Sequence, residues 1–128
     1  MASHRLTLSL LPSTFAVVRL DAADPWPAWA LDASDLVALT RTADELSVIC
    51  REDAVPAGVT SQGGWRALKV HGPFPFDTVG VLAALSGALA EAAVSLLAVS
   101  TFETDYLLVP GERLDEAVAA LAARHHVM

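Results

Sequence analysis

The sequence predicts an α+β fold in which helices cover one face of antiparallel sheets. Short apolar runs bounded by Pro, Gly and Asp recur along the chain, as strands do. Two stretches in the second half place apolar residues at helical spacing instead. Hydrophobic residues make up 54% of the 128 residues, which is enough for one ordinary domain or two small ones.

The composition limits the classes of partner and the compartment. A net charge of −7 disfavours general binding to nucleic acid or anionic membranes, because both need a basic surface. The single cysteine, Cys50, lies in an apolar run, so we expect a buried thiol in a reducing, cytoplasmic compartment. No apolar run reaches the length of a membrane span, and we expect a soluble protein.

The first half of the chain is predicted to be poor in helix. Four apolar runs predict strands, over residues 6–11, 15–20, 36–41 and 46–51. Pro12, Ser13 and Thr14 predict a turn between the first two. The glycine-rich residues 57–64 predict a joint between two halves.

A loop rich in proline and tryptophan interrupts the first half. Pro25 and Pro27 exclude a regular strand ladder there. We expect Trp26 and Trp29 to pin this loop on the core; the alternative is that they form an exposed surface for a protein partner.

The second half predicts six elements: a strand over residues 65–71, a helix from Thr78, strands over 94–101 and 106–109, a helix whose last turn holds Arg124, and a strand from His125. This order is that of a ferredoxin-like βαββαβ unit. The first half resembles a degenerate, helix-poor version of the same plan. We therefore predict two such units in tandem, in residues 1–62 and 63–128.

The first predicted helix has a start signal and an apolar stripe. Asp77 is suited to be its N-cap. Gly87 lowers helix propensity, so we expect close packing at that position. Five residues form the predicted buried stripe: Val79, Leu82, Leu85, Leu89 and Ala93.

The helix start and the following hairpin offer complementary chemistry for a zwitterion. A carboxylate needs unpaired N–H groups, which a helix N-terminus supplies, and Gly80 would let a ligand approach that backbone. An ammonium needs acceptors, and the predicted hairpin over residues 102–105 offers Glu103 and Asp105. A structural explanation stays open: Asp77 caps the helix, Gly80 permits packing and Asp105 is a turn residue.

Three motifs carry a family resemblance. The segments LTRTADELSVIC (39–50), FDTVGVLAAL (76–85) and VSTFETDYLLVP (99–110) resemble tandem ACT-domain proteins related to the arginine-sensing CASTOR proteins, and small bacterial ACT-domain proteins. The resemblance extends from Phe15 to about Ala123. It implies a regulatory protein that binds an amino acid between adjacent ACT domains.

Carried onto this chain, the resemblance implies a ligand site of seven residues: Thr78, Val79, Gly80, Val81, Thr101, Phe102 and Asp105. The first four would line the helix start, the next two would close the pocket, and Asp105 would hold a polar group of the ligand. The eukaryotic sensor has four ACT domains and this chain would have two. The resemblance thus implies a homodimer whose second domains meet at the pocket.

The sequence favours binding over catalysis. It lacks the glycine-rich phosphate, dinucleotide and serine-hydrolase motifs, and no His or Lys is placed to complement Glu103 and Asp105 in acid–base catalysis. We expect His125 and His126 to lie on a solvated tail, and expect no metal or cofactor.

Two classes of function follow. The first is a regulatory domain for a free amino acid that changes its own association or that of a protein partner. The second is a structural or protein-interaction domain without ligand, with Trp26 and Trp29 as the contact.

Overall fold

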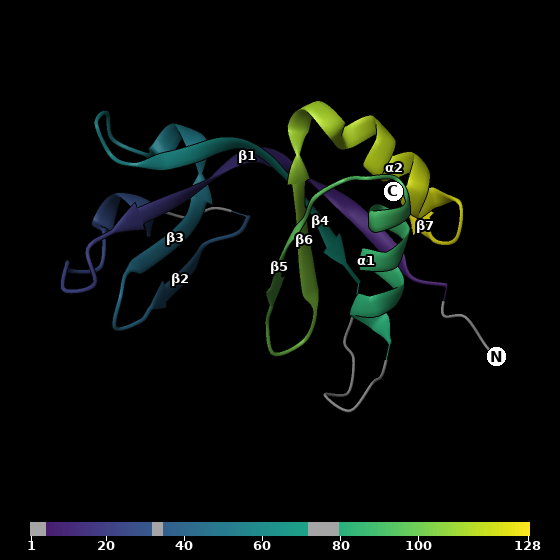
Figure 1. Ribbon diagram of the computed structural model, residues 1–128, viewed down its shortest axis with the longest axis horizontal. Coiled ribbons are helices and arrows are strands. Elements are labelled where there is room, and N and C mark those ends of the chain that lie inside the picture. Colours follow the sequence, from purple (N-terminus) through teal and green to yellow (C-terminus); the bar gives the residue numbers. More distant parts are fainter. Residues whose placement is uncertain (1–4, 32–34, 72–79) are drawn as a thin grey trace. The chain divides into compact units, whose positions relative to one another are not determined.

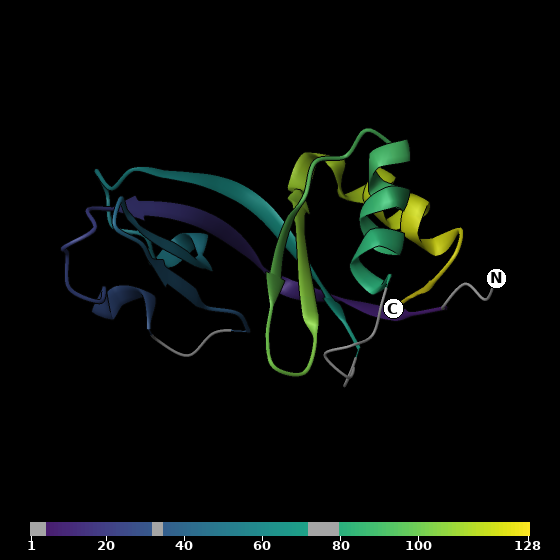
Figure 2. The same cartoon turned by 60° about the horizontal axis from the view of Figure 1, so that its bottom comes forward.

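The computed structural model describes residues 5–31, 35–71 and 80–128 (Figures 1 and 2). Contacts divide the chain into two compact units. We call Met1–Leu11 with Arg66–Met128 the helical unit, and Pro12–Trp65 the strand unit. Across the described ranges, no helix has the length and apolar character needed to cross a membrane.

The helical unit has the predicted order of elements. Six elements follow one another: β4 (Ser61–Val70), α1 (Val81–Glu91), β5 (Leu97–Ser100), β6 (Asp105–Pro110), α2 (Leu114–Ala122) and β7 (His126–Val127). A short 3-10 turn, η3 (Gly111–Arg113), leads into α2. The succession of strand, helix, strand, strand, helix and strand is therefore confirmed in this unit.

The sheet of the helical unit contains one strand more than the βαββαβ order supplies. Its strands are arranged β7-β1-β4-β6-β5, where β1 (Thr7–Leu20) enters with its first residues. β7 pairs with β1 in parallel, with Thr7 opposite His126. The N–H of His71, just after β4, donates to the carbonyl of Thr7 at 2.8 Å. The amino-terminal strand thus separates β4 from β7.

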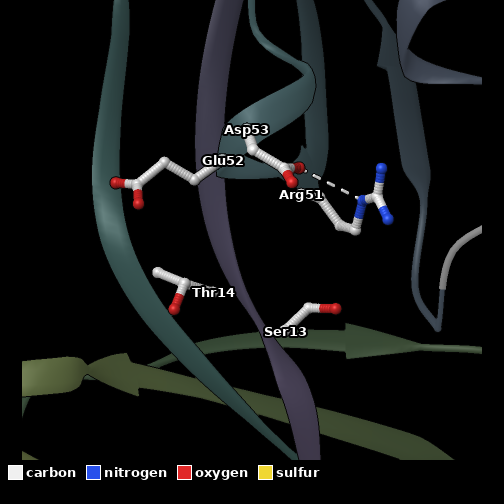
Figure 3. A pocket seen from close by; sticks show the side chains of 5 residues that line it. All are labelled: Ser13, Thr14, Arg51, Glu52 and Asp53. Carbon is white, nitrogen blue, oxygen red and sulfur yellow. Dashed lines mark ion pairs between the residues drawn. The ribbon is translucent and has the colours of Figure 1, made fainter.

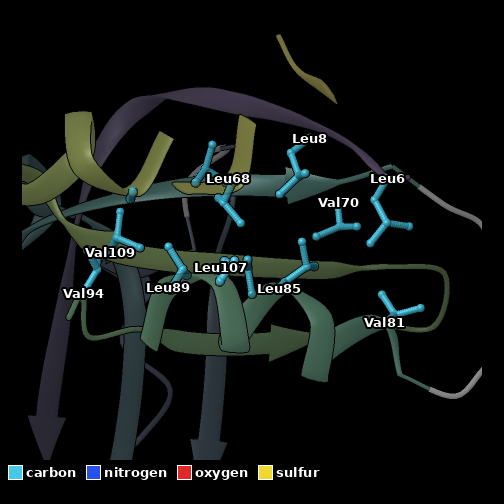
Figure 4. Close-up of a cluster of buried hydrophobic side chains, with 13 residues drawn as sticks. Leu6, Leu8, Leu68, Val70, Val81, Leu85, Leu89, Val94, Leu107 and Val109 are labelled. Atoms are coloured by element: carbon cyan, nitrogen blue, oxygen red, sulfur yellow. The ribbon is translucent and has the colours of Figure 1, made fainter. Parts of the chain in front are cut away.

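Both helices pack on one core cluster of the helical unit (Figure 4). Its buried members come from β1 and the residue before it, from β4, α1, β6 and α2, and from the segment between α1 and β5: Leu6, Leu8, Leu68, Val70, Val81, Leu85, Ala88, Leu89, Val94, Leu107, Val109, Ala117 and Leu121. Leu107 and Val109 alternate with Leu108 along β6, so these two residues share the helix-facing side of the sheet.

The start of α1 differs from the prediction. Gly80, its N-cap, has φ +88°, a left-handed conformation that a helix cannot continue through. The helix therefore begins at Val81, and the predicted start at Thr78 is wrong; Asp77, Thr78 and Val79 lie outside the described residues.

The buried face of α1 also differs from the predicted stripe. Its buried residues are Val81, Leu85, Ala88 and Leu89, whereas Leu82 is 38% exposed. Ala93 lies past the helix end and is exposed. A Cβ added at Gly87 would meet no atom of the described residues within 4 Å, so packing against them does not explain this glycine.

The end of α1 is closed by backbone hydrogen bonds and by an arginine. The N–H of Val94 donates to the carbonyl of Leu89 at 2.9 Å, and the N–H of Ala93, at φ +58°, donates to that of Ala90 at 3.0 Å. The guanidinium of Arg113 donates to the last carbonyls of this turn, at Ala92 and Ala93. A cation is favourable there because it faces the negative end of the helix dipole.

The strand unit contains no α-helix among its described residues. Its strands are arranged β2-β3-β1-β4, with β2 (Ala38–Arg41) and β3 (Leu46–Arg51) antiparallel. Two 3-10 turns, η1 (Ala28–Ala30) and η2 (Glu52–Ala54), complete it. The core consists of Ala16, Val18, Ala30, Leu46, Val48 and Cys50.

β1 runs unbroken from Thr7 to Leu20, so the predicted turn at Pro12, Ser13 and Thr14 is wrong. The fixed φ of proline, about −65°, lies within the extended region, and proline is tolerated in a strand where its missing N–H is not needed for pairing. The boundary between the two units crosses β1 at this point: residues up to Leu11 belong to the helical unit, and residues from Pro12 belong to the strand unit. The assignment of residues 1–62 as a separate domain stays a prediction.

The two tryptophans of the loop differ. Trp29 packs against the core of the strand unit, as predicted. Trp26 is 53% exposed, and the guanidinium carbon of Arg41 lies 4.7 Å from the centre of its ring. Only one indole therefore anchors this loop in the core.

Cys50 is buried, and burial raises the pKa of its thiol, as expected of a core residue.

His125 is buried, so the predicted solvated tail is wrong for this residue. Its Nδ1 accepts a hydrogen bond from the N–H of Leu6 at 3.1 Å, which places the proton of the neutral ring on Nε2. Nε2 has no partner among the described residues. Burial, and then the charges of Arg124 and Arg5, lower the pKa of His125.

The substitution Gly80→Ala should lower the free energy of unfolding by about 1 kcal/mol, because alanine resists the left-handed conformation. Gly87→Ala is the matched control, since both positions are exposed and open. It should raise stability by about 0.5–1 kcal/mol, because alanine favours the helix. Urea denaturation measures both; an unchanged Gly80→Ala variant would contradict a role for the φ at Gly80.

Stability should fall as the pH drops below the ordinary histidine pKa of about 6.5. The pKa of His125 is lowered by folding, so the unfolded chain binds the proton first and is stabilised by acid. His125→Gln should remove this part of the pH dependence between pH 7.5 and 5.5, whereas His126→Gln, at an exposed position, should keep it. Urea denaturation at each pH measures the free energy of unfolding. If this free energy changes equally with pH in the wild type and both variants, His125 is not the source of the pH dependence.

Candidate functional site

The predicted site residues divide into three groups. Thr78 and Val79 lie outside the described residues. Gly80 and Val81 form the start of α1. Thr101, Phe102 and Asp105 belong to the hairpin of β5 and β6, with Asp105 as the first residue of β6.

Alternation along β6 places Asp105 on the same side of the sheet as α1. Asp105, Leu107 and Val109 are two residues apart, so their side chains share one face. Leu107 and Val109 belong to the cluster that contains Val81 and Leu89 of α1. The side chain of Asp105 therefore lies on the same face of β6 as Leu107, as the next residue on that face toward the turn.

The start of α1 and the hairpin turn lie at the same end of the helical unit. Figures 1 and 2 both place the β5–β6 turn beside the beginning of α1. In Figure 4, Val81 lies at the turn end of β6, whereas Leu89 and Val109 lie toward the other end. Gly80 and Val81 are thus at the end of the unit where β6 begins with Asp105.

The helix start is suited to bind an anion. Gly80 has no side chain and supplies no capping oxygen, while its carbonyl accepts the first helical bond from Ala84 at 2.9 Å. The first N–H groups of a helix have no intrahelical acceptor, and the helix dipole makes them a binding site for carboxylates. Among the described residues, a Cβ at Gly80 would meet nothing within 4 Å, so none of them covers this backbone on that side.

The turn of the hairpin is fixed by two threonines. The N–H and hydroxyl of Thr101 donate to the carbonyl of Thr104 at 2.8 and 3.1 Å, and the N–H of Thr104 donates to the Thr101 hydroxyl at 3.2 Å. The Thr104 hydroxyl, which is buried, donates to the carbonyl of Val70 near the end of β4. This bond ties the hairpin to the strand from which the chain continues toward α1.

Asp105 is a strand residue, so its interpretation as a turn residue is wrong. The turn comprises residues 101–104, and Asp105 lies directly opposite Ser100 in the ladder. Its Oδ1 accepts a hydrogen bond from the Ser100 hydroxyl at 2.7 Å. Asp105 is half-buried, whereas Phe102 is 79% exposed and Glu103 is exposed in the turn.

Thr104 and Ser100 are absent from the residues predicted from sequence. The Thr-x-x-Thr spacing at positions 101 and 104 is a signal for a side-chain-stabilised turn and could have identified Thr104. Ser100 is recognisable only once the hairpin register pairs it with Asp105.

The strand unit contains a polar hollow of about 270 Å³ (Figure 3). It is lined by Ser13, Thr14, Arg51, Glu52 and Asp53. Its charged groups already have partners: Nε of Arg51 lies 3.3 Å from Oδ1 of Asp53, and Oε1 of Glu52 accepts from the N–H of Gly64 at 2.9 Å. None of the predicted ligand residues lines this hollow.

A second hollow of about 320 Å³ lies over β1 and β3 of the strand unit. Its lining includes Val17, Arg19 and Ser47. The charge of Arg19 is paired with Asp21 at 3.9 Å, and its guanidinium donates to the carbonyl of Asp44. The charged side chains of the first hollow, and Arg19 in the second, therefore already have partners. Among the described residues, no group of three His, Cys, Asp or Glu side chains could hold a metal ion.

Comparison with known proteins matches each half of the chain to a family model. A model of the ACT domain matches residues 60–123, and a model described as an N-terminal domain matches residues 13–58. The human cytosolic arginine sensor for mTORC1 subunit 1 is 36% identical over 69 residues, or 52% of this chain. That match spans 21% of the sensor's length.

Two solved structures show the same fold. A crystal structure of an Agrobacterium tumefaciens protein has a TM-score of 0.91 at 36% identity, with 98% of this chain and 94% of that chain covered. The regulatory subunit of aspartate kinase from Thermus flavus has a TM-score of 0.61 at 14% identity, with 97% and 99% covered, and this likeness concerns the fold alone.

The ACT-domain match comprises 64 of the 128 residues and contains β4, α1, β5, β6 and α2 of the helical unit. With half of its length matched in this way and its elements in βαββαβ order, the chain belongs to the ACT-domain family.

Proposed function

We propose that this protein is a regulatory ACT-domain protein that binds a free amino acid at the end of the helical unit where α1 begins. The observation that carries the proposal is the placement of Asp105 on the α1 side of the sheet, at the same end as the helix start. The carboxylate of an amino acid would meet the N–H groups at Gly80 and Val81. Its ammonium, or a cationic side chain, would meet Asp105.

The family supports this proposal. The ACT-domain model covers all described members of the predicted site, and the human relative is by name a cytosolic arginine sensor. We propose that amino-acid binding extends to this chain, as a cytoplasmic protein without catalytic activity, metal or cofactor. Which amino acid is bound depends on the side chains that meet the ligand's own side chain.

A second copy would complete the site. Thr101 and Phe102 are exposed in the β5–β6 hairpin, so a site that includes them needs another surface to exclude water. We propose a homodimer in which the ligand lies between ACT domains, with the strand unit as a degenerate, helix-poor partner of the helical unit in tandem. Ligand would then change the association of the copies or of a regulated protein partner. Nucleic acid and membranes are not among the proposed partners.

One observation favours the second function, a protein-interaction domain without ligand. Trp26 is 53% exposed although Arg41 stacks on its ring and donates to the carbonyls of Ala22 and Asp24. An indole held rigidly at the surface is typical of a contact for a protein partner. The two functions use different units and can be tested separately.

Isothermal titration calorimetry against each of the twenty amino acids tests the proposed function. We expect one or a few to bind with a dissociation constant below the millimolar range. Sedimentation velocity with and without that amino acid tests whether ligand changes the association of the copies. Absence of heat from all twenty at millimolar concentration would contradict amino-acid binding. It would favour the second function, protein interaction through the Trp26 surface.

Asp105→Asn should weaken binding of that amino acid about 10- to 100-fold, because the charge-assisted hydrogen bond is lost. The melting temperature should stay nearly unchanged, since Asn retains an oxygen that can accept from Ser100. Glu103→Gln is the matched control, because it removes an equal charge from the exposed turn. Equal losses of affinity in both variants would indicate long-range electrostatics, and a large loss of stability in Asp105→Asn would indicate a structural role.

A further inference from the structure

The carboxylate of Asp105 is held by one neighbouring side chain. Ser100 and Asp105 form the last pair of the β5–β6 ladder before the turn. The Ser100 hydroxyl donates to Oδ1 of Asp105 at 2.7 Å, a short distance typical of a hydroxyl bound to a charged oxygen. Among the residues that the structure describes, Oδ2 of Asp105 has no hydrogen-bond partner.

The backbone beneath this pair is fixed from both sides. On the turn side, Thr101 and Thr104 hydrogen bond with each other, and Thr104 is tied to Val70 of β4. On the strand side, Leu107 is fully buried in the core. The remaining freedom of Asp105 is therefore the rotation of its side chain, and the hydroxyl of Ser100 restricts that rotation.

We infer that Ser100 is a positioning residue for ligand binding: it holds Oδ1 of Asp105 so that Oδ2 is presented, already oriented, to a cationic group of the ligand. This inference rests on the proposed function and deepens it. A group that meets Oδ2 must donate a hydrogen bond and is favoured when it carries positive charge, so the chemical class is an ammonium or a guanidinium. Orientation before binding strengthens the complex, because the ligand does not have to immobilise a free side chain.

Ser100→Ala should weaken binding of the amino acid about 5- to 10-fold, the cost of immobilising a side chain on binding. Ser100→Thr keeps the hydroxyl and suits a strand, so it should restore affinity to within about 2-fold of the wild type. Ser95→Ala is the control, because Ser95 is an exposed serine in the segment before β5. Calorimetry with the ligand identified among the twenty amino acids measures all three.

A double-mutant cycle separates positioning from a general structural effect. If Ser100 acts through Asp105, the double variant Ser100→Ala/Asp105→Asn should bind no more weakly than Asp105→Asn alone. The analogue of the ligand that lacks its cationic group should bind the wild type and Ser100→Ala equally well. Additive losses in the cycle, or failure of Ser100→Thr to restore binding, would overturn the inference.

The inference can also be tested without any ligand. Nuclear magnetic resonance of the side chain should show one χ1 rotamer for Asp105 in the wild type and in Ser100→Thr, and averaging between rotamers in Ser100→Ala. If the wild type binds no amino acid, the proposed function fails while this result still decides whether Ser100 orients Asp105. An identical rotamer distribution in all three proteins would overturn the positioning role.

Discussion

The packing of α1 on β6 is the constraint on which the candidate site depends. Leu107 and Val109 are buried in the same cluster as Val81, Leu85 and Leu89, so one face of β6 is committed to the helix. Because side chains alternate along a strand, this commitment also decides the side on which Asp105 lies. A shift of the register by one residue would turn Asp105 away from α1 and move Leu108, which is now buried on the other face of β6, to the helix side. The core thus sets the direction of the polar group.

The end of the helical unit combines a rigid part with an open part. The rigid part is the hairpin, in which the two threonines of the turn, the bond from Thr104 to Val70 and the Ser100–Asp105 pair hold the backbone and the carboxylate. The open part is the start of α1, where no described residue covers the position of a Cβ at Gly80. Rigid groups around an accessible surface are what a binding site requires, because the ligand then orders few side chains.

The sequence predicts much of the helical unit because its local signals agree with its packing. Pro110 ends β6 and the spacing of Ala117 and Leu121 marks the buried face of α2. The helix start was misplaced because Asp77 is a good N-cap by residue type, whereas the positive φ of Gly80 decides where the helix begins. Pro12 was misread for a similar reason, since proline signals a turn but also fits an extended backbone.

The residues of the candidate site could be proposed from the sequence, whereas the contacts that surround them could not. Asp105 and Gly80 were identified by their chemistry, whereas Ser100 and Thr104 act through partners that only the register and the tertiary fold bring together. The burial of His125 was missed for the same reason, because its hydrogen-bond partner is the distant residue Leu6, just before β1. Contacts between residues far apart in the chain leave no local pattern in a single sequence.

The central claim is that one amino acid binds to both the start of α1 and Asp105. Its most direct test is a nuclear magnetic resonance titration of the nitrogen-labelled protein with the twenty amino acids. The backbone N–H signals of Val81, Leu82 and Asp105 should shift together, at the same ligand concentration, with one or a few of them. No shift with any amino acid, or shifts confined to the strand unit, would contradict the claim.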